Sequence, residues 1–442
     1  MKIAVAGTGY VGLVTGVCLA EKGHYVSCVD IDSKKVKLMQ SGISPIFEPG
    51  LEELMRKNKE KLNFTTDYKE AFKDAEVIFI GVGTPEKIDG SADLSYVYSV
   101  AVQIAQSIEK DCVVVIKSTV PIGTNDKVET ILKQNTLRKV NVYVASNPEF
   151  LAQGTAVRDT LYPSRIVIGT EDSFSKKSLR EVYKQFDTPI VETNRRSAEM
   201  IKYASNDFLA LKISFINEIA NLCEIVGADI EDVALGMGYD SRIGNQFLSS
   251  GIGYGGSCFP KDTKALHWLA NFHDYELKTI KATIEVNENQ KMKLIKKSRK
   301  YFNSLSGKNI AILGLAFKPG TDDLREAPSL VNIPIMLEDG ANVKVWDPVA
   351  MDNFKVFFQD KVTYCETIEE TIENADICFI FTEWREIKEF DIMKYSKFMR
   401  RPIVLDGRNC YNLSCIQKVN IIYDSIGRET INTLEKSKVG LF

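Results

Sequence analysis

The sequence opens with Lys2-Ile-Ala-Val-Ala-Gly7-Thr-Gly9-Tyr-Val-Gly12, an apolar run that leads directly into three spaced glycines. The run predicts a buried strand, and residues 14–19 continue with the composition of a helix. In this pattern the first glycine makes the turn and the second lets the backbone approach a pyrophosphate, while the third lets the helix pack on the strand. The stretch therefore predicts a Rossmann-type dinucleotide-binding unit.

A second predicted strand, residues 24–29, ends at Asp30. A carboxylate there can accept hydrogen bonds from both ribose hydroxyls and repels a 2′-phosphate, so the sequence predicts NAD rather than NADP as cofactor. Lys35 is a further candidate at the ribose, with a solvated helix face as the alternative. The predicted cofactor contacts of this unit are Gly7, Gly9, Tyr10, Val11, Gly12, Asp30 and Lys35.

Three further strands are predicted at the spacing of an α/β domain, at residues 75–81, 112–116 and 142–145. Each ends in polar residues. Because ligands of open α/β sheets bind at the carboxyl ends of the strands, we expect Thr84, Thr119 and Glu149 near the cofactor and substrate. For Thr84, capping of the next helix is an equal alternative.

A long helix is predicted after Arg196. One of its faces is apolar and comprises Ala204, Phe208, Leu211, Phe215, Ile219 and Leu222. The opposite face is also largely apolar, so we expect the helix to be buried nearly all round, as a spine shared between domains or subunits. Lys202 and Asn206 lie one turn apart on that second face. Burial would make Lys202 a candidate base, and the alternative is a lysine at the helix end that reaches solvent.

The pattern of the first unit recurs near the end of the chain. Asn309-Ile-Ala-Ile-Leu-Gly314 resembles the first strand and its glycine, and residues 342–347 and 374–380 resemble later strands. These repeats predict a second Rossmann-like unit without the spacing of three glycines.

Cationic residues stand at the expected strand ends of the second unit, at Lys318, Arg325 and Arg408. Basic loop residues are usually only solvated, but cationic side chains also suit a phosphate group. A phosphate other than the cofactor pyrophosphate is therefore the expected guest. Residues 427–442 carry no clear pattern, and we expect a flexible tail there.

One cysteine follows a glycine-rich run, in Gly251-Ile-Gly-Tyr-Gly-Gly-Ser-Cys-Phe-Pro-Lys-Asp-Thr263. Pro260 suits the first turn of a helix, so Cys258 is expected at a helix N-terminus. Free backbone N–H groups, the helix dipole and the ammonium of Lys261 would favour its thiolate, which is the nucleophilic form. Asp262 is a candidate acid or base. The alternative is that Cys258 is a small buried hydrophobic residue.

Composition excludes several classes of protein. The chain has 442 residues, enough for two or three domains, and a net charge of -3 argues against a nucleic-acid surface. Neither a signal peptide nor a membrane-spanning segment is predicted. Nine cysteines without CxxC pairs indicate reduced thiols in a cytoplasm, and three scattered histidines offer no metal cluster.

These elements suggest one chemistry. A base removes the proton of an alcohol while NAD takes a hydride, and a thiolate traps the aldehyde as a thiohemiacetal. Loss of a second hydride gives a thioester, which water cleaves to an acid. Two NAD are consumed for each substrate.

Three stretches carry a resemblance to the UDP-glucose/GDP-mannose dehydrogenase family, namely residues 251–263, Asn147-Pro-Glu-Phe-Leu151 and Phe317-Lys-Pro-Gly-Thr-Asp-Asp-Leu-Arg-Glu-Ala-Pro328. With the dinucleotide fingerprint, the likeness covers nearly the whole chain. It implies NAD-dependent oxidation of the C6 alcohol of UDP-glucose to UDP-glucuronate by a cytoplasmic homodimer. By this resemblance Cys258 is the nucleophile, and the other catalytic residues are Lys202, Glu149, Asn206, Asp262 and Thr119.

The resemblance also implies ligand contacts. The implied substrate contacts are Phe150, Leu151, Lys202, Asn206, Arg242, Ser249, Tyr254, Gly255, Lys318 and Arg408, of which Arg242 would reach the substrate of a neighbouring subunit. Further implied cofactor contacts are Thr84, Thr119, Gln153 and Arg325. Gln153 stands where many family members have glutamate, and because an amide cannot act as a base, that role shifts toward Glu149 and Lys202.

We therefore predict an α/β protein with two Rossmann-like doubly wound domains joined by a long central helix and a helical dimerisation domain. The expected limits are 1–196 for the NAD-binding domain, 197–298 for the central helical domain and 299–442 for the UDP-sugar-binding domain.

Two alternatives stay open, and a third conflicts with the residues present. The same chemistry could act on GDP-mannose or a UDP-N-acetylhexosamine. A two-electron dehydrogenase would leave Cys258 a structural role. A non-catalytic NAD sensor would need Lys202, Asn206, Cys258 or Asp262 to be missing, and all four are present.

Overall fold

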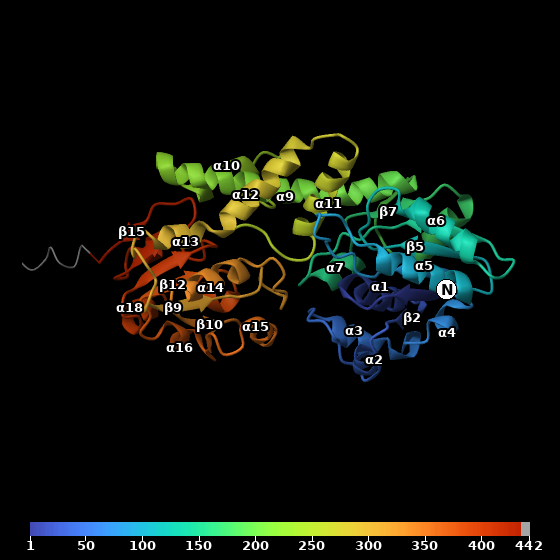
Figure 1. Cartoon of the computed structure of the whole chain (residues 1–442), viewed down its shortest axis with the longest axis horizontal. Coiled ribbons are helices and arrows are strands. Elements are labelled where there is room, and N and C mark those ends of the chain that lie inside the picture. The colour runs from blue at the N-terminus through green and yellow to red at the C-terminus, as the bar shows by residue number, and fades with distance from the viewer. Residues whose placement is uncertain (435–442) are drawn as a thin grey trace, which may run out of the picture. The chain divides into compact units, whose positions relative to one another are not determined.

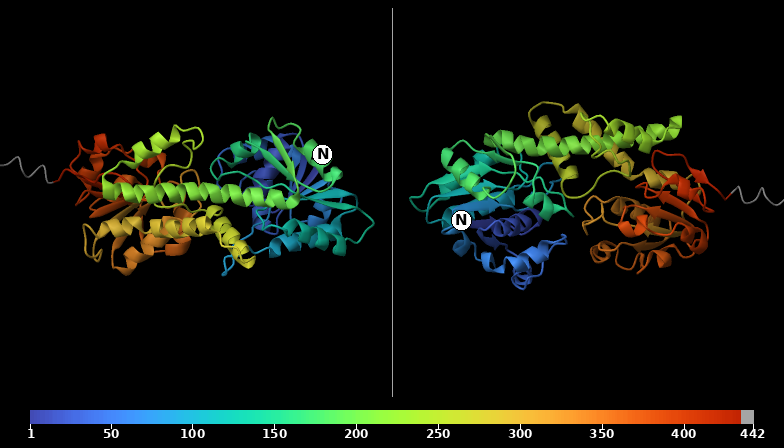
Figure 2. Two further views of the ribbon diagram at one scale, coloured as in Figure 1. Left: turned by 90° about the horizontal axis from the view of Figure 1, so that it is seen from above. Right: turned by 180° about the vertical axis from the view of Figure 1, so that it is seen from behind.

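The computed structural model describes residues 1–434, which form two compact units (Figure 1). The first unit comprises Met1–Ser205 and Lys264–Tyr275, and the second comprises Asn206–Thr263 and the chain from Glu276 onward. Two helices belong partly to each unit. They are α9 (Arg195–Val226), which Figure 2 shows as one continuous rod, and α11 (Phe259–Phe272).

The first unit is built on an eight-stranded sheet in the order β3-β2-β1-β4-β5-β6-β7-β8. Its strands are β1 (Lys2–Ala6), β2 (Tyr25–Val29), β3 (Leu62–Thr65), β4 (Val77–Ile80), β5 (Cys112–Ile116), β6 (Val142–Ser146), β7 (Ile166–Gly169) and β8 (Ile190–Thr193). All neighbours pair in parallel except β6 and β7. The first six positions follow the order of a Rossmann fold, as predicted.

Helices cover both faces of this sheet. They are α1 (Tyr10–Glu21), α2 (Ser33–Gln40), α3 (Leu51–Lys57), α4 (Tyr68–Phe72), α5 (Ser95–Ser107), α6 (Thr124–Asn135), α7 (Ala156–Leu161) and α8 (Ser173–Val182). Side chains of a strand alternate between faces, so Ile3 and Val5 pack with α1 and α8, while Ala4 and Ala6 pack with α5 and α6. Burial on both faces explains why β4 and β5 read as unbroken apolar runs.

The second unit repeats the plan with a seven-stranded sheet in the order β11-β10-β9-β12-β13-β14-β15. Its strands are β9 (Asn309–Leu313), β10 (Asn342–Trp346), β11 (Thr363–Tyr364), β12 (Ile377–Ile380), β13 (Ile403–Asp406), β14 (Ile422–Asp424) and β15 (Ile431–Asn432). Only β14 and β15 pair antiparallel within this described sheet. The prediction of two Rossmann-like domains and a long central helix is confirmed.

The other helices of the second unit all have fewer residues than α9. They are α10 (Ile230–Gly238), α12 (Lys278–Lys291), α13 (Lys293–Ser298), α14 (Pro328–Glu338), α15 (Met351–Phe358), α16 (Ile368–Ile372), α17 (Arg385–Lys388), α18 (Met393–Phe398) and α19 (Leu413–Ile416). Within the described residues, no helix is long and apolar enough to cross a membrane.

The expectation that α9 is buried nearly all round is wrong for the single chain. Side chains of the face that carries Phe208, Phe215 and Leu222 are 61%, 45% and 52% exposed. The opposite face does lie in the interior, where Ile216 and Ala220 join the core of the second unit. Periodicity reveals two apolar faces, but it does not tell whether the same chain covers both of them.

The expected tail from residue 427 is also partly wrong. Arg428 is buried, with its guanidinium bonded to the Ser425 hydroxyl, the Tyr411 carbonyl and the Tyr423 hydroxyl. Strand β15 then closes the sheet against β14. Residues 435–442 of this expected tail lie outside the described residues.

Candidate active site

The glycine turn between β1 and α1 has the geometry that a dinucleotide requires. Gly7 has a φ of +92°, and a Cβ on Gly12 would overlap the Gly7 carbonyl oxygen, so both positions need glycine for the fold. A Cβ on Gly9 would instead meet no described atom within 4 Å. Gly9 therefore leaves space outside the N-terminus of α1, where no side chain of the described residues caps the helix.

Asp30 at the end of β2 is held ready to accept hydrogen bonds. One of its oxygens accepts from the backbone N–H and hydroxyl of Thr8, and the other accepts from the Asp32 N–H at 3.0 Å. Burial raises the pKa of Asp30, but these bonds and the charge of Lys35 outweigh it and lower the pKa overall. The carboxylate is thus ionised and only half-buried, as ribose binding requires.

Asp347 follows β10 in the second unit, as Asp30 follows β2 in the first, but its oxygens are already used by hydrogen bonds within the protein. Its Oδ2 accepts from the N–H groups of Leu315 and Ala316 and from the Trp384 indole, and its Oδ1 accepts from the N–H groups of Val349 and Ala350. Asp347 is also buried. This saturation, together with the lost glycine spacing, explains in physical terms why the second unit does not repeat the dinucleotide site.

Thr84, Thr119 and Gln153 occupy loops after the strands of the first unit. The Thr84 hydroxyl donates to the Thr119 carbonyl at 2.9 Å, and α5 begins only at Ser95, so the capping alternative for Thr84 is wrong. Gln153 is buried, and neither its amide oxygen nor its amide nitrogen has a hydrogen-bond partner among residues 1–434. A buried amide whose nitrogen and oxygen are both unused is complementary to another carboxamide.

These observations agree with NAD as the cofactor bound by the first unit. Gly9 leaves room for a pyrophosphate, Asp30 offers a carboxylate to a ribose, and Gln153 offers an unpaired amide that matches the carboxamide of nicotinamide. Tyr10 and Lys35 lie beside this turn. The Tyr10 hydroxyl donates to the Phe47 carbonyl, and the Lys35 N–H donates to Asp32, which caps α2.

The first unit also holds a buried ion pair. The Lys202 ammonium lies 2.9 Å from Glu149 Oε1, and both side chains are at most 5% exposed. The second oxygen of Glu149 accepts from the Leu151 N–H at 2.8 Å. The Phe150 ring lies under the Lys202 ammonium at 5.4 Å and under the Arg165 guanidinium at 3.8 Å. Lys202 is therefore not the solvent-exposed lysine of the alternative.

Lys117 is a buried residue of this region that the sequence analysis missed. Its ammonium donates to Asn147 Oδ1 at 3.0 Å, and the same oxygen accepts from the Tyr183 hydroxyl. Burial lowers the pKa of Lys117 to about 8, the charge of Glu149 opposes this shift, and that of Lys202 adds to it. The signal in the sequence was a lysine directly after a buried strand, next to the predicted Thr119.

Cys258 immediately precedes α11, as predicted. Its carbonyl accepts the N–H of Asp262 at 2.9 Å, and its sulfur lies 3.7 Å from the Ser257 hydroxyl. Cys258 is partly exposed, whereas burial raises the pKa of Cys18 and Cys28 to about 12. An accessible thiol at a helix N-terminus suits a nucleophile better than the buried packing role of the alternative.

Asp262, one turn into α11, is fully buried and firmly oriented. Its Oδ2 accepts from the Asn206 amide at 2.7 Å, and its Oδ1 pairs with the Lys261 ammonium. The structure thus brings Asn206, Cys258 and Asp262 of the predicted residues together within the second unit. Lys261 forms an ion pair with Asp262.

Side-chain amides hold the glycine-rich loop before Cys258. Asn217 of α9 accepts the Gly251 N–H, Gln290 of α12 donates to the Gly251 carbonyl, and Asn287 of α12 bonds both the N–H and the carbonyl of Tyr254. These three amides were not predicted from the sequence. They lie on helices far from the loop in sequence, so only the fold reveals them.

Close packing explains two glycines of this loop. A Cβ on Gly255 would overlap the Glu326 carbonyl, and one on Gly256 would meet the Phe317 ring at 2.7 Å. The Gly256 N–H donates to the Arg325 carbonyl at 2.7 Å. The loop is therefore pressed against the segment that carries Lys318, which itself lies over the Phe317 ring.

The predicted arginines have different surroundings. Arg408 joins the loops of the second unit, donating to the carbonyls of Phe381, Gly253 and Phe317. Arg325 is 60% exposed and pairs with Asp323. Arg242 is 87% exposed and pairs with Asp240, and Ser249 is exposed as well. Within the described residues, Arg242 and Ser249 are therefore not brought together with the other predicted substrate contacts.

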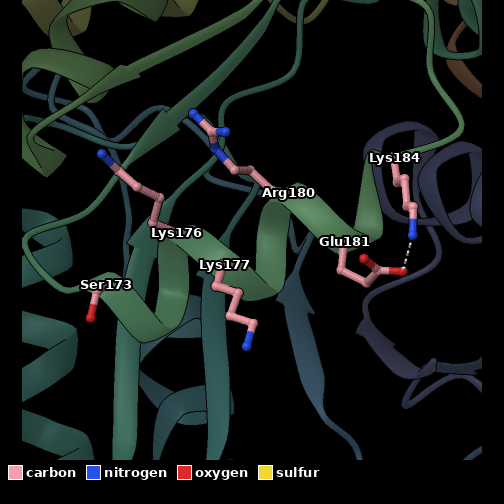
Figure 3. Close-up of a pocket in the computed structure, with 6 residues that line it drawn as sticks. All are labelled: Ser173, Lys176, Lys177, Arg180, Glu181 and Lys184. Carbon is pink, nitrogen blue, oxygen red and sulfur yellow. Dashed lines mark hydrogen bonds and ion pairs between the residues drawn. The ribbon is translucent and has the colours of Figure 1, made fainter.

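A shallow surface pocket lies elsewhere, on α8 (Figure 3). Its lining consists of Ser173, Lys176, Lys177, Arg180, Glu181 and Lys184. Lys176 and Arg180 share Glu192, and Lys184 pairs with Glu181, so two carboxylates offset part of the charge of its four cationic side chains. None of the predicted site residues lies in it. The described residues also contain no cluster of histidine, cysteine and carboxylate side chains that could hold a metal ion.

Known protein families and relatives match the chain over nearly its whole length. Three models of the UDP-glucose/GDP-mannose dehydrogenase family match in succession: the NAD binding domain at residues 1–187, the central domain at 196–289 and the UDP binding domain at 311–413. UDP-glucose 6-dehydrogenase YwqF of Bacillus subtilis is 51% identical over 433 residues, which cover 98% of each chain.

Two solved structures extend the likeness to the whole fold. A UDP-glucose dehydrogenase from Pyrobaculum islandicum has a TM-score of 0.91 and 37% identity, over 97% of this chain and 98% of that one. A UDP-D-ManNAc dehydrogenase from Pyrococcus horikoshii has a TM-score of 0.86 and 29% identity, over 97% and 99%. The chain is therefore an NAD-dependent dehydrogenase that takes a nucleotide sugar, and it belongs to the UDP-glucose/GDP-mannose dehydrogenase family.

Proposed function

We propose that the chain oxidises the C6 alcohol of UDP-glucose to the carboxylate of UDP-glucuronate, with two NAD consumed per sugar. The observation that carries this proposal is Cys258, a partly exposed thiol at the start of α11 beside the oriented carboxylate of Asp262. A dehydrogenase that stops at the aldehyde has no need of such a nucleophile.

NAD, when bound, supplies the hydride acceptor for both oxidations. The residues that would hold it are Gly7, Gly9, Tyr10, Val11, Gly12, Asp30, Lys35, Thr84, Thr119, Gln153 and Arg325. Asp30 accepts hydrogen bonds from a ribose and disfavours a 2′-phosphate, and the open space at Gly9 admits the pyrophosphate. Gln153 would pair its unused amide with the carboxamide of the nicotinamide.

The nucleotide sugar is held by the second unit and by residues next to Glu149. We assign this role to Phe150, Leu151, Lys202, Asn206, Arg242, Ser249, Tyr254, Gly255, Lys318 and Arg408. Lys318 and Arg408 are cations suited to the diphosphate, and the Arg408 side chain is already fixed by three carbonyl groups.

Glu149 and Lys202 handle the first proton. Their ion pair keeps a carboxylate and an ammonium in fixed positions in the interior, where hydrogen bonds to charged groups are strong. We propose that this pair accepts the proton of the C6 hydroxyl as the alcohol becomes an aldehyde, with Thr119 in the connecting water network.

Cys258 then makes the covalent intermediate. Its thiolate adds to the aldehyde carbon, so a C–S bond forms as the C=O π bond opens. The developing alkoxide is stabilised by the Asn206 amide and takes back the proton held by the Glu149–Lys202 pair, which gives the hydroxyl of a thiohemiacetal. Loss of the second hydride and of the hydroxyl proton leaves a thioester. Water adds to the thioester carbon, the C–S bond breaks, sulfur leaves as the thiol or thiolate, and Asp262 accepts a proton from the water.

The preference for UDP-glucose rests on the relatives. The 51% identity to YwqF, which is named a UDP-glucose 6-dehydrogenase, contrasts with 29% to the UDP-D-ManNAc dehydrogenase. GDP-mannose and a UDP-N-acetylhexosamine are the alternative substrates, and a two-electron reaction with a structural Cys258 is the alternative chemistry.

We further propose a cytoplasmic homodimer with three domains, at residues 1–196, 197–298 and 299–442. The exposed apolar row of Phe208, Phe215 and Leu222 on α9 supports a partner subunit, because large side chains of this kind are normally covered. None of the nine cysteines forms a disulfide bond within residues 1–434, which supports a reducing compartment. The three family matches support the division into domains.

The test is the amount of NADH formed per UDP-glucose consumed, with GDP-mannose and UDP-N-acetylglucosamine run alongside. We expect two NADH per sugar for the wild type and loss of the product acid in Cys258→Ala. Cys415→Ala, which removes an exposed cysteine of the second unit, is the matched control and should keep both. One NADH per sugar with full activity of Cys258→Ala would refute the thioester route, and turnover of only a rival sugar would refute UDP-glucose as substrate.

A further inference from the structure

Asp207 is the most unusual carboxyl of the second unit. It is 2% exposed, and neither Oδ1 nor Oδ2 has a hydrogen-bond partner among residues 1–434. Buried carboxyl groups without partners are rare, because the loss of hydration is not compensated. The group thus has hydrogen-bonding capacity that the described chain does not use, and this capacity points to a bound water or ligand atom.

The surroundings of Asp207 place it beside the proposed chemistry. It directly follows Asn206 on α9, whose amide donates to Asp262. The charged groups that act on Asp207 are Asp262 and Lys261 of α11, and Asp207 in turn acts on Tyr254 of the glycine-rich loop. Asp262 is itself occupied by Asn206 and Lys261.

Asp207 and Asp262 differ in the partners that they have. Asp262 has an ammonium and an amide to stabilise its charge, whereas Asp207 has neither. Burial and the nearby charge of Asp262 raise the pKa of Asp207 to about 8, and Lys261 only partly opposes this. At neutral pH the Asp207 carboxyl is therefore uncharged, and a carboxyl kept neutral beside a second one is a common arrangement in active sites.

We propose that Asp207 is a positioning residue, which in its uncharged form accepts a hydrogen bond from the water that Asp262 activates for hydrolysis of the Cys258 thioester. This inference rests on the proposed function and extends it. The water donates one hydrogen bond to the Asp262 carboxylate and the other to the carbonyl oxygen of Asp207. The lone pairs of the water oxygen can then point toward the thioester carbon. The C–O bond forms, the C–S bond breaks, the proton of the water passes to Asp262, and Asp207 keeps its own proton throughout.

Two variants separate this role from simple packing. Asp207→Asn keeps the size, the carbonyl oxygen and the lack of charge, so it should hydrolyse the thioester like the wild type at neutral pH. Asp207→Ala removes the acceptor, and misplacement of the water should slow hydrolysis about 100-fold. The Cys258 adduct should then accumulate, as measured by mass spectrometry of quenched single turnovers, while the first burst of NADH keeps its rate. Unchanged hydrolysis in Asp207→Ala would overturn the proposal.

The pH profile gives an independent test. Above a pH of about 8 the wild type gains a negative charge at Asp207, and the rate of hydrolysis should fall. Asp207→Asn should lose this decline, whereas Glu218→Gln, which alters an exposed carboxyl of α9, should keep it. A decline that persists unchanged in Asp207→Asn would refute the role.

A measurement without substrate separates this inference from the proposed function. Between the ordinary aspartate pKa and about 8, the unfolded chain carries a charge at Asp207 that the folded protein does not, so stability is lost as pH rises. The Tm of Asp207→Asn relative to the wild type should therefore increase from about pH 4 to about pH 8 and then stay constant. A flat difference would overturn the uncharged state of Asp207 even if UDP-glucose proved not to be the substrate.

Discussion

The ammonium of Lys202 lies 2.9 Å from the carboxylate of Glu149, and both groups are removed from solvent. Neither charge can be changed alone without consequence for the other, because an unpaired charge in the interior is strongly disfavoured. The pair is therefore both a proposed proton acceptor and a structural contact of the first unit, and experiments on it must separate these two effects.

We predict that Glu149→Gln slows the first hydride transfer more than thioester hydrolysis, because Glu149 is proposed to accept the proton of the C6 hydroxyl. The amide cannot accept a proton, and loss of such a group reduces rates about 10²–10⁴-fold. Rapid-mixing measurements of NADH and of the Cys258 adduct would distinguish the two steps. If thioester hydrolysis were slowed more than the first hydride transfer, the assignment of Glu149 to the first proton would be wrong.

The variant Glu149→Gln should also lower stability, by about 3–5 kcal/mol, since it leaves the buried Lys202 ammonium without a counter-charge. The double variant Glu149→Gln with Lys202→Met should recover most of this loss in denaturant unfolding. Its activity should stay low. Recovery of activity together with stability would mean that the pair serves the fold only.

Two glycines of the first turn should respond in opposite ways. Gly9→Ala adds a methyl group to open space at a φ of -74°, so the fold should keep its Tm while the affinity for NAD falls. Gly12→Ala drives a methyl group into the Gly7 carbonyl and should cost about 1–3 kcal/mol of stability or more. Calorimetric NAD titration and thermal unfolding of both variants check this, and equal effects on Tm would contradict it.

Lys117 should make the stability of the protein depend on pH in the alkaline range. Burial lowers its pKa to about 8 in the folded protein, so below that pH both folded and unfolded chains carry the charge and the full penalty applies. Between about 8 and the ordinary lysine pKa of about 10.4, the folded protein becomes neutral first and the penalty disappears. The wild type should therefore gain stability relative to Lys117→Met over this range. A Tm difference that is flat with pH would refute the shift.

The exposed row on α9 should form the contact between subunits. Phe208→Glu and Phe215→Glu would bury a charge without a partner, which should raise the dimer dissociation constant by about 100-fold or more. Sedimentation velocity over a dilution series measures this. Ile88→Glu alters a fully exposed apolar residue of the first unit and should leave the association unchanged. A dimer that persists in both phenylalanine variants would exclude this surface.

The sequence predicted the two Rossmann-like sheets, the position of Cys258 before a helix and the interior location of Lys202, because each depends on local periodicity or turn chemistry. Lys117, Asn217 and Asn287 were missed, since a single polar residue in an otherwise ordinary stretch gives no sign of its distant partner. Asp207 was missed for the same reason. The expected burial of α9 failed because apolar periodicity identifies a face to be covered but does not identify the chain that covers it.

The apolar row on α9 has a consequence for how the enzyme tolerates dilution. If the folded subunit is stabilised by a second copy, the equilibrium between folded and unfolded chains follows mass action, and the melting temperature rises with protein concentration. Newly made subunits would then exist for a time as monomers, in which Phe208 and Leu222 are exposed to water and to neighbouring chains. The abundance of the enzyme would thus set part of its own lifetime.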